Sequence, residues 1–476
     1  MYKQVLRFID LHISRRTIIG IAGIIAGIMV AFSNPPPGLN AAGMQGLGIL
    51  LWAIWWWIFN ILPEYVTAML MIALYIGLGL VSTEVAFASF TSSTWWILVT
   101  ALGLGAGMSK SGLLTRMVLV ILKVFPKSLK GQIIGLLGVG FVTAPFIPSL
   151  TAKVAMLAPI SMAMSDSLGY KRKGPEANAL FLAMFTGVRN AAPLFISASV
   201  LGYMILGLLP DYVKVQFNMM YWFLCALPWF IAISILNYFT ILVRYKPKNE
   251  KRTDITFITK ELEALGAMSK NERIMLAVII FTILLWASEP LHGIAPHVVG
   301  LISLCCVLAV GVYERSGFRA SITWDSLIFI GIVMNLSTIL GALNINDWIV
   351  SIFSPIIAQM IVNPYLFVIG LAVITVLLRF VIVSELAYIS IFMALLLPLI
   401  IQSGINPWVV GIVIYCMVNP WLVLYQNPIY LAAYYSTNGE MVKHQEMAYF
   451  CVLYLINSLI ALLISIPYWQ YLHLLP

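Results

Sequence analysis

The sequence predicts an all-α polytopic membrane protein with about eleven transmembrane helices and two re-entrant hairpins, arranged as two inverted repeats. Three observations support this prediction: the composition, the recurrence of long apolar runs, and the distribution of the basic residues. Of the 476 residues, 62% are hydrophobic and only 9% are charged, whereas soluble proteins carry about 25% charged residues. The composition therefore excludes a soluble globular protein.

Apolar runs with nearly the length of a membrane crossing recur along the chain. The clearest are residues 18–31, 46–61, 219–243, 274–287 and 449–466. A helix needs about 20 residues to cross a hydrocarbon core of about 30 Å. The first run follows a basic segment, and the residues after it ("FSNPPPGLN", 32–40) lack the small-residue cleavage site of a signal peptide. We therefore expect the first helix to be retained.

The basic residues define the expected orientation. If the N-terminus is cytoplasmic and each crossing changes the side, the basic clusters all fall on the cytoplasmic face: 3–16, 110–130, 171–173, 244–273, 315–319 and 443. Only Lys214 is expected on the other face. This bias follows the positive-inside rule. The net charge of +9 therefore indicates orientation and not a nucleic-acid partner, and we expect a protein of the cytoplasmic membrane, with the lipid bilayer around it.

The alternation of sides requires two segments that enter the membrane and leave by the same face. They are 132–167, which opens inward, and 364–403, which opens outward. Each is long enough for two half-length helices around a break, which the membrane interior tolerates only where protein or water shelters the backbone. The predicted division is an N-terminal segment with the first helix (1–45), a first repeat (46–244), a cytoplasmic linker (245–271) and a second repeat (272–476).

A second kind of break follows each hairpin. "GVRNAAP" (187–193) and "NPWLVLYQNP" (419–428) interrupt long apolar segments in corresponding positions of the two halves. Because the two hairpins open to opposite faces, the repeat is inverted. Inverted repeats with paired discontinuous helices are typical of secondary transporters, whose substrate site lies near the midplane.

Four charged residues lie in apolar surroundings: Lys153, Arg189, Arg379 and Glu385. A charged side chain at the bilayer centre costs about 2.5–3.5 kcal/mol on insertion scales, so such residues are usually functional and have a partner. Arg offers a planar fork for a carboxylate and Lys a point charge. These four residues are therefore candidates for the substrate site or for coupling.

The hairpin tips carry a family resemblance. The first tip reads Ser149-Leu150-Thr151, followed by Pro159-Ile160; in the second half, "SELAYISIFMALLLPLI" places Glu385 before a tip at Tyr388-Ile389-Ser390. From about Gly46 onward the chain resembles the divalent anion/sodium symporters of the ion transporter superfamily, whose tips read Ser-Asn-Thr. Leu150 and Ile389 replace both motif asparagines. Leucine and isoleucine offer a hard cation only backbone oxygens, so sodium coupling is not expected.

The resemblance implies a transporter of small organic anions, di- or tricarboxylates first, that works as an elevator. A transport domain would slide against the scaffold of a homodimer, linked to it by amphipathic arms at 113–125 and 346–358. The substrate-binding residues expected on this basis are Ser149, Leu150, Thr151, Lys153, Arg189, Asn190, Tyr388, Ile389, Ser390, Gln426 and Asn427. A fixed charge on Lys153 would replace sodium and favour exchange, with Glu385 and Arg379 serving charge or proton coupling.

Several alternatives stay open at this stage. Lys153 could extend to the cytoplasmic face, and Arg379 and Glu385 could form a structural ion pair. Glu385 could pair with Lys153, or it could titrate in a sodium- or proton-coupled carrier. An intramembrane enzyme is the remote alternative, because no nucleophile with its base stands out. No cofactor or metal site is expected, since the histidines and cysteines lack ligand spacing.

Overall fold

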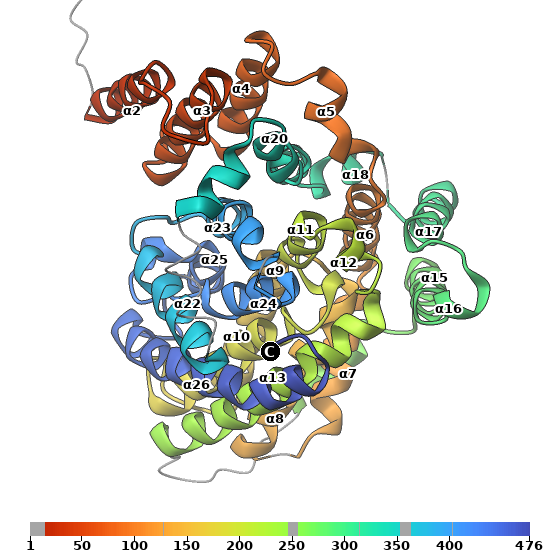
Figure 1. Cartoon of the computed structure of the whole chain (residues 1–476). Helices are drawn as coiled ribbons and strands as arrows, with labels where there is room; N and C mark the ends of the chain where they lie inside the picture. Colours follow the sequence, from red (N-terminus) through yellow and green to blue (C-terminus); the bar gives the residue numbers. More distant parts are fainter. Residues whose placement is uncertain (1–14, 127, 246–255, 314, 353–362, 402) are drawn as a thin grey trace, which may run out of the picture.

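The computed structural model describes residues 15–476 except 127, 246–255, 314, 353–362 and 402 (Figure 1). Every regular element in this part of the chain is an α-helix or a short 3₁₀-helix. The prediction of an all-α polytopic membrane protein is confirmed. The predicted arm at 346–358 lies partly outside the described residues.

The first half of the chain forms the elements from α2 to α13. Their bounds are α2 Arg15–Ala31, α3 Ala41–Ile58, α4 Glu64–Gly77, α5 Thr83–Phe87, η1 Ala88–Thr91, α6 Ser93–Lys110, α7 Leu113–Val124, α8 Leu129–Thr143, η2 Ala144–Phe146, α9 Leu150–Ser167, α10 Pro175–Ala191, η3 Ile196–Ala198, α11 Val200–Leu208, α12 Asp211–Lys214 and α13 Met219–Arg244.

The second half forms the elements from α14 to α26. Their bounds are α14 Thr256–Ala264, α15 Lys270–Ala287, α16 Glu289–His292, α17 Pro296–Val310, α18 Arg315–Ser321, α19 Trp324–Val333, α20 Leu336–Ala342, α22 Pro364–Leu378, α23 Glu385–Ile401, α24 Pro407–Met417, η4 Leu424–Gln426, α25 Pro428–Ser436 and α26 His444–Tyr471.

The lengths of the helices bear on the number of crossings. Among the described residues, five spans are long and apolar enough to cross a membrane: Ala41–Ile58, Leu129–Phe146, Met219–Arg244, Trp324–Ala342 and His444–Tyr471. The pair Thr83–Thr91 and Ser93–Lys110, bent by 45°, would make a sixth. Five more apolar helices are shorter, namely α4, α17, α22, α23 and α24. The count of about eleven crossings stays a prediction, as does a re-entrant path for Leu129–Phe146, which is long enough to cross.

Helix breaks occur in all four predicted segments. In 132–167, α8 and η2 end at Phe146 and α9 begins at Leu150; in 364–403, α22 ends at Leu378 and α23 begins at Glu385. The second break agrees with the prediction to within about two residues, since α24 ends at Met417 and α25 begins at Pro428. The first break lies later than predicted: α10 continues to Ala191, so Arg189 and Asn190 are still helical, and α11 begins only at Val200. The second tip differs from the expectation: the turn lies at 379–384, so 388–390 are already helical.

The packing partners repeat from one half to the other. Helix α10 packs against α8 and α9, as α24 packs against α22 and α23. Helix α9 also contacts α25 of the other half, and α23 contacts α11, while α13 and α26 pack against each other. Figure 1 shows α9, α10, α11 and α24 in the centre, with α2–α4 at one edge and α15–α17 at another. We propose the two-repeat division on this ground.

A close contact between α8 and α10 fixes the position of the first break. A Cβ atom added to Gly140 would lie 2.1 Å from the carbonyl carbon of Gly187, and one added to Gly187 would lie 2.9 Å from the carbonyl oxygen of Leu136. Small residues at such contacts let helix backbones approach closely inside membranes. Gly187 stands two residues before Arg189, so this contact also positions a candidate site residue.

We predict that Gly140→Ala destabilises the protein by about 1–3 kcal/mol, because the added methyl group has no space against the backbone of α10. The measurement is thermal unfolding of the purified protein in detergent. Gly77→Ala is the matched control, since a Cβ there would meet nothing within 4 Å. Equal unfolding temperatures for the two variants would contradict the prediction.

Candidate functional site

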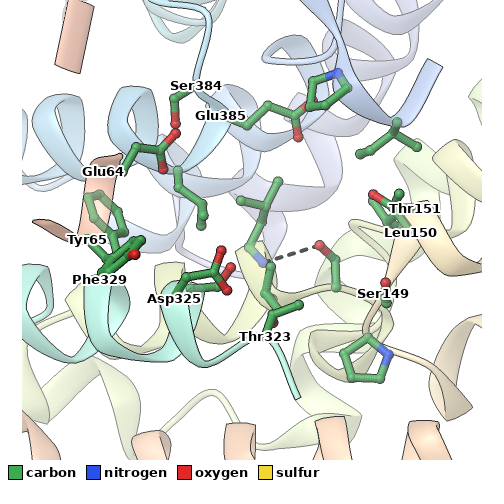
Figure 2. A pocket seen from close by; sticks show the side chains of 18 of the residues that line it. Glu64, Tyr65, Ser149, Leu150, Thr151, Thr323, Asp325, Phe329, Ser384 and Glu385 are labelled. Carbon is green, nitrogen blue, oxygen red and sulfur yellow. Dashed lines mark hydrogen bonds between the residues drawn. The ribbon is translucent and has the colours of Figure 1, made fainter. Parts of the chain in front are cut away.

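A cavity of about 530 Å³ lies where several helices begin (Figure 2). Its lining includes the first residues of four helices that follow the hairpin tips and the breaks: 149–151 at α9, 199–201 at α11, 384–386 at α23, and 428–429 at α25. The beginnings of two further helices, α4 and α19, contribute Glu64 and Asp325. The cavity is therefore surrounded by helix N-termini.

The side chains at these helix starts explain why the chain breaks there. Ser149 Oγ accepts a hydrogen bond from Ala152 N (3.2 Å), and Ser199 and Ser384 cap α11 and α23 in the same way. Asn427 Oδ1 accepts from the backbone N–H groups of residues 429 and 430, both at 3.0 Å. Ser and Asn are preferred N-caps because they satisfy backbone donors that have no partner within the helix.

The electrostatic character of the cavity has two components. Each helix N-terminus carries a partial positive charge, and the N–H groups that its cap does not bind have no partner within the helix; both features favour anions. Three carboxylates also line the cavity, those of Glu64, Asp325 and Glu385, whereas the described lining residues include neither Lys nor Arg. Figure 2 shows Glu64 beside Ser384, and Asp325 near Thr323. The basic candidates of the sequence therefore lie behind the cavity wall.

Four of the predicted site residues line the cavity: Ser149, Leu150, Thr151 and Glu385. Lys153 does not. Its side chain is fully buried, and its Nζ donates to the carbonyl oxygen of Ala198 at 3.1 Å, in the break between α10 and α11. Because the ammonium is buried, the alternative in which it extends to the membrane surface is wrong. Lys153 fixes the backbone just before Ser199.

The predicted second tip, Tyr388-Ile389-Ser390, lies inside α23 and is buried. The Ser390 hydroxyl donates to the carbonyl oxygen of Leu386 at 2.7 Å, and the ring of Tyr388 stacks on Phe392 with 4.3 Å between centroids. None of the three lines the cavity. The prediction missed Ser384, which caps the helix one residue before Glu385.

The other predicted polar residues hold backbone and helices together. Gln426 Oε1 accepts from Leu422 N at 3.0 Å, inside the break before α25. Asn190 Oδ1 accepts from Asn237 Nδ2 at 3.2 Å, and Asn237 Oδ1 accepts from Asn457 Nδ2 at 3.0 Å. This chain of amides joins α10, α13 and α26. None of these residues lines the cavity.

Arg379 binds backbone carbonyl groups around the second hairpin tip. Its Nε donates to the carbonyl oxygen of Val418 and its Nη2 to that of Gln426, both at 2.7 Å. Nη1 donates to the carbonyl oxygens of residues 382 and 383. The guanidinium thus connects the hairpin turn to both ends of the break between α24 and α25.

Glu385 pairs with Arg189. Its Oε1 lies 3.8 Å from Nη2 of Arg189, and both side chains are almost fully buried. In the part of the chain that the structure describes, no ion pair joins Glu385 to Arg379 or to Lys153. The structure therefore corrects both pairings that the sequence left open.

The sequence matches known membrane proteins over nearly its whole length. Residues 15–475 match the family model described as "Sodium:sulfate symporter transmembrane region". The chain belongs to this family. Its relatives include dicarboxylate transporter 2 of spinach chloroplasts, 25% identical over 69% of this chain and 60% of the relative. A putative malate transporter of Bacillus subtilis, YflS, is 24% identical over 68% of this chain and 70% of the relative.

A solved structure is similar in fold. The YdaH transporter of Alcanivorax borkumensis matches with a TM-score of 0.57 and 14% identity, over 84% of this chain and 90% of that chain. At this identity the match concerns the fold alone. As a member of the sodium:sulfate symporter family, the protein is a membrane transporter and not an enzyme.

For this transporter, sequence reasoning missed Glu64, Ser199, Asp325 and Ser384. A signal for the two serines exists, since each stands as a potential N-cap before an apolar run. Glu64 and Asp325 are acids in the first turn of a helix, which is common at any helix start. Their position beside the hairpin tips depends on how distant helices pack, and the sequence has no local signal for it.

We predict that Arg379→Met lowers the unfolding temperature markedly, because the backbone carbonyl groups that it binds lose their partners at a cost of about 1–3 kcal/mol each. Thermal unfolding in detergent measures the effect. Arg172→Met is the control: Arg172 is about half exposed and binds Asp166 and Glu440 at the surface, where ion pairs contribute little. A loss no larger than in the control would refute the assigned role.

Proposed function

We propose that the protein exchanges small organic anions, dicarboxylates first, without sodium, by an elevator movement of the hairpins and broken helices. The observation that carries this proposal is the meeting of four helix N-termini, from both hairpins and both breaks, at one cavity. Converging N–H groups favour an anion there. The names of the spinach and Bacillus relatives support a dicarboxylate as the substrate.

The buried charges around the cavity support a substrate with two negative charges. Lys153, Arg189, Arg379 and Glu385 are all buried on the helices of the hairpins and breaks. In their ordinary charge states, three cations against one anion leave a net charge of +2. A dicarboxylate dianion would neutralise it, which lowers the cost of moving the loaded site through the membrane. The empty site would keep the charge, so the carrier would return only when loaded.

The acids on α4 and α19 do not contradict this proposal. In the elevator mechanism these helices belong to the scaffold, so Glu64 and Asp325 would not travel with the site. They act on the anion only in the state in which it faces them. A like charge at that position weakens anion binding, which would favour release on that side.

We predict that proteoliposomes preloaded with unlabelled succinate accumulate labelled succinate, whereas empty vesicles do not, with or without a sodium gradient. Lys153→Ala is expected to lose most of this exchange, because the mutation removes both a charge and the bond to Ala198. Lys153→Arg keeps the charge and so separates the effect of the charge from that of the bond to Ala198. Lys171→Ala, in an exposed loop, serves as the matched control.

Uptake into empty vesicles driven by sodium would refute the exchange mechanism. Flux of sodium or protons without substrate would support the second candidate, a cation-coupled carrier with Glu385 as the titrating group. That candidate rests on the position of Glu385, a nearly buried acid in the wall of the cavity.

We further propose a homodimer in the cytoplasmic membrane with a cytoplasmic N-terminus. The clusters of basic residues support the orientation, and the resemblance supports the dimer. We predict that a membrane-impermeant maleimide added to intact cells labels Asp211→Cys but not Lys171→Cys, in a background without Cys305 and Cys306. Both residues are exposed, so the reverse labelling pattern would refute the orientation.

A further inference from the structure

We propose that Glu385 is an internal competitor of the substrate: it holds Arg189 in the empty site, and a substrate carboxylate displaces it. This inference rests on the proposed function and specifies how the same site takes its anion. Arg189 binds the substrate carboxylate only in the loaded state. The Glu385 side chain alternates between Arg189 and the cavity.

Arg189 has unused hydrogen-bonding capacity. The residue is 1% exposed, and none of its side-chain nitrogens, Nε, Nη1 or Nη2, has a hydrogen-bond partner among the residues that the structure describes. A guanidinium offers five N–H donors in a fixed fork, and buried polar groups are almost always satisfied. A buried cation with all of its donors free therefore indicates a ligand that binds in another state of the protein.

Two other arginines show how this chain satisfies a guanidinium whose role is structural. Every side-chain nitrogen of Arg379 donates to a backbone carbonyl. Arg116 donates to both carboxylate oxygens of Glu272, at 2.7 and 3.2 Å. By contrast, 3.8 Å separates Nη2 of Arg189 from Oε1 of Glu385, which is too long for a hydrogen bond. The Arg189–Glu385 pair is the loosely held one.

The placement of the two charges allows the pair to separate. Glu385 is the first residue of α23, and Arg189 lies in the last turn of α10. A helix N-terminus stabilises an anion and a C-terminus a cation, so each charge keeps a favourable partner within its own helix. Separation therefore costs less than it would for a buried pair without this support.

The cavity gives the substrate a route to the Arg189–Glu385 pair. Glu385 lines the cavity, whereas Arg189 lies behind it with its side chain fully buried. A carboxylate that enters meets Glu385 first, and the free fork of Arg189 can bind it through two hydrogen bonds. Glu385 then turns toward the water of the cavity. No proton is transferred and no covalent bond changes.

The test is a double-mutant cycle on succinate binding, measured by calorimetry on the purified full-length protein. Glu385→Gln removes the competing charge, so we expect succinate to bind on the order of tenfold more tightly. Arg189→Gln is expected to weaken binding by a similar factor. With Arg189→Gln in place, Glu385→Gln should bring no further gain, because the group for which the two anions compete is absent.

Asp325→Asn is the matched control, since Asp325 lines the same cavity but belongs to α19. Its effect is expected to be smaller and to be the same with or without Arg189. If the glutamine variant does not fold, Arg189→Lys takes its place in the cycle. Lysine keeps the charge but not the fork, so the gain from Glu385→Gln is then expected to be smaller than in the wild type, and an equal gain would contradict the inference.

Glu385→Gln that binds succinate no more tightly than the wild type would overturn the inference. An equal gain in both backgrounds would also overturn it, because it would show a general charge effect. If the wild type exchanges succinate while Glu385→Gln abolishes only coupled proton movement, Glu385 carries a proton and is not a competitor. A wild type that neither binds nor exchanges succinate would refute the proposed function, and this inference with it.

Discussion

The structure depends on one constraint: a helix that stops at membrane depth leaves backbone groups without partners, and lipid cannot supply them. The chain stops helices at two hairpin tips and in two further breaks. At the starts of the helices that follow, Ser149, Ser199, Ser384 and Asn427 accept the free N–H groups. At the ends of the preceding helices, Arg379 and Lys153 donate to free carbonyls. Two cations that the sequence assigned to the substrate site or to coupling, Lys153 and Arg379, thus replace missing backbone partners.

This arrangement connects the architecture with transport. Because four interrupted helices resume at one place, their N–H groups and partial charges converge on the same cavity. The helix starts that need caps are also the starts that can receive an anion. Arg189 is the exception among the buried cations: within the described residues it donates to no backbone carbonyl, and its ion-pair partner is Glu385 at 3.8 Å. The hydrogen bonds therefore distinguish Lys153 and Arg379, which hold the backbone, from Arg189, which does not.

The predictions from sequence succeeded and failed for reasons that particular residues make clear. The break after Met417 was predicted within two residues, because Asn and Pro interrupt the apolar run there, whereas the first break was placed too early, since α10 continues through Arg189 to Ala191. The second tip was placed at Tyr388-Ile389-Ser390 because that segment aligns with a family motif, whereas the helix already begins at Glu385. Helix starts are set locally by a cap, here Ser384, and a motif alignment does not detect it.

What the sequence determined by itself is the fold class, the family resemblance, the broken segments and the presence of four charges in apolar surroundings. These features follow from composition and from patterns among residues that are close together in the sequence. Only the tertiary structure decided the partners: Arg189 with Glu385, Lys153 with Ala198, and Glu64 and Asp325 facing the hairpin tips. Which of several buried charges meet depends on how helices far apart in the sequence pack, because a charge attracts every neighbour of opposite sign and geometry alone selects among them.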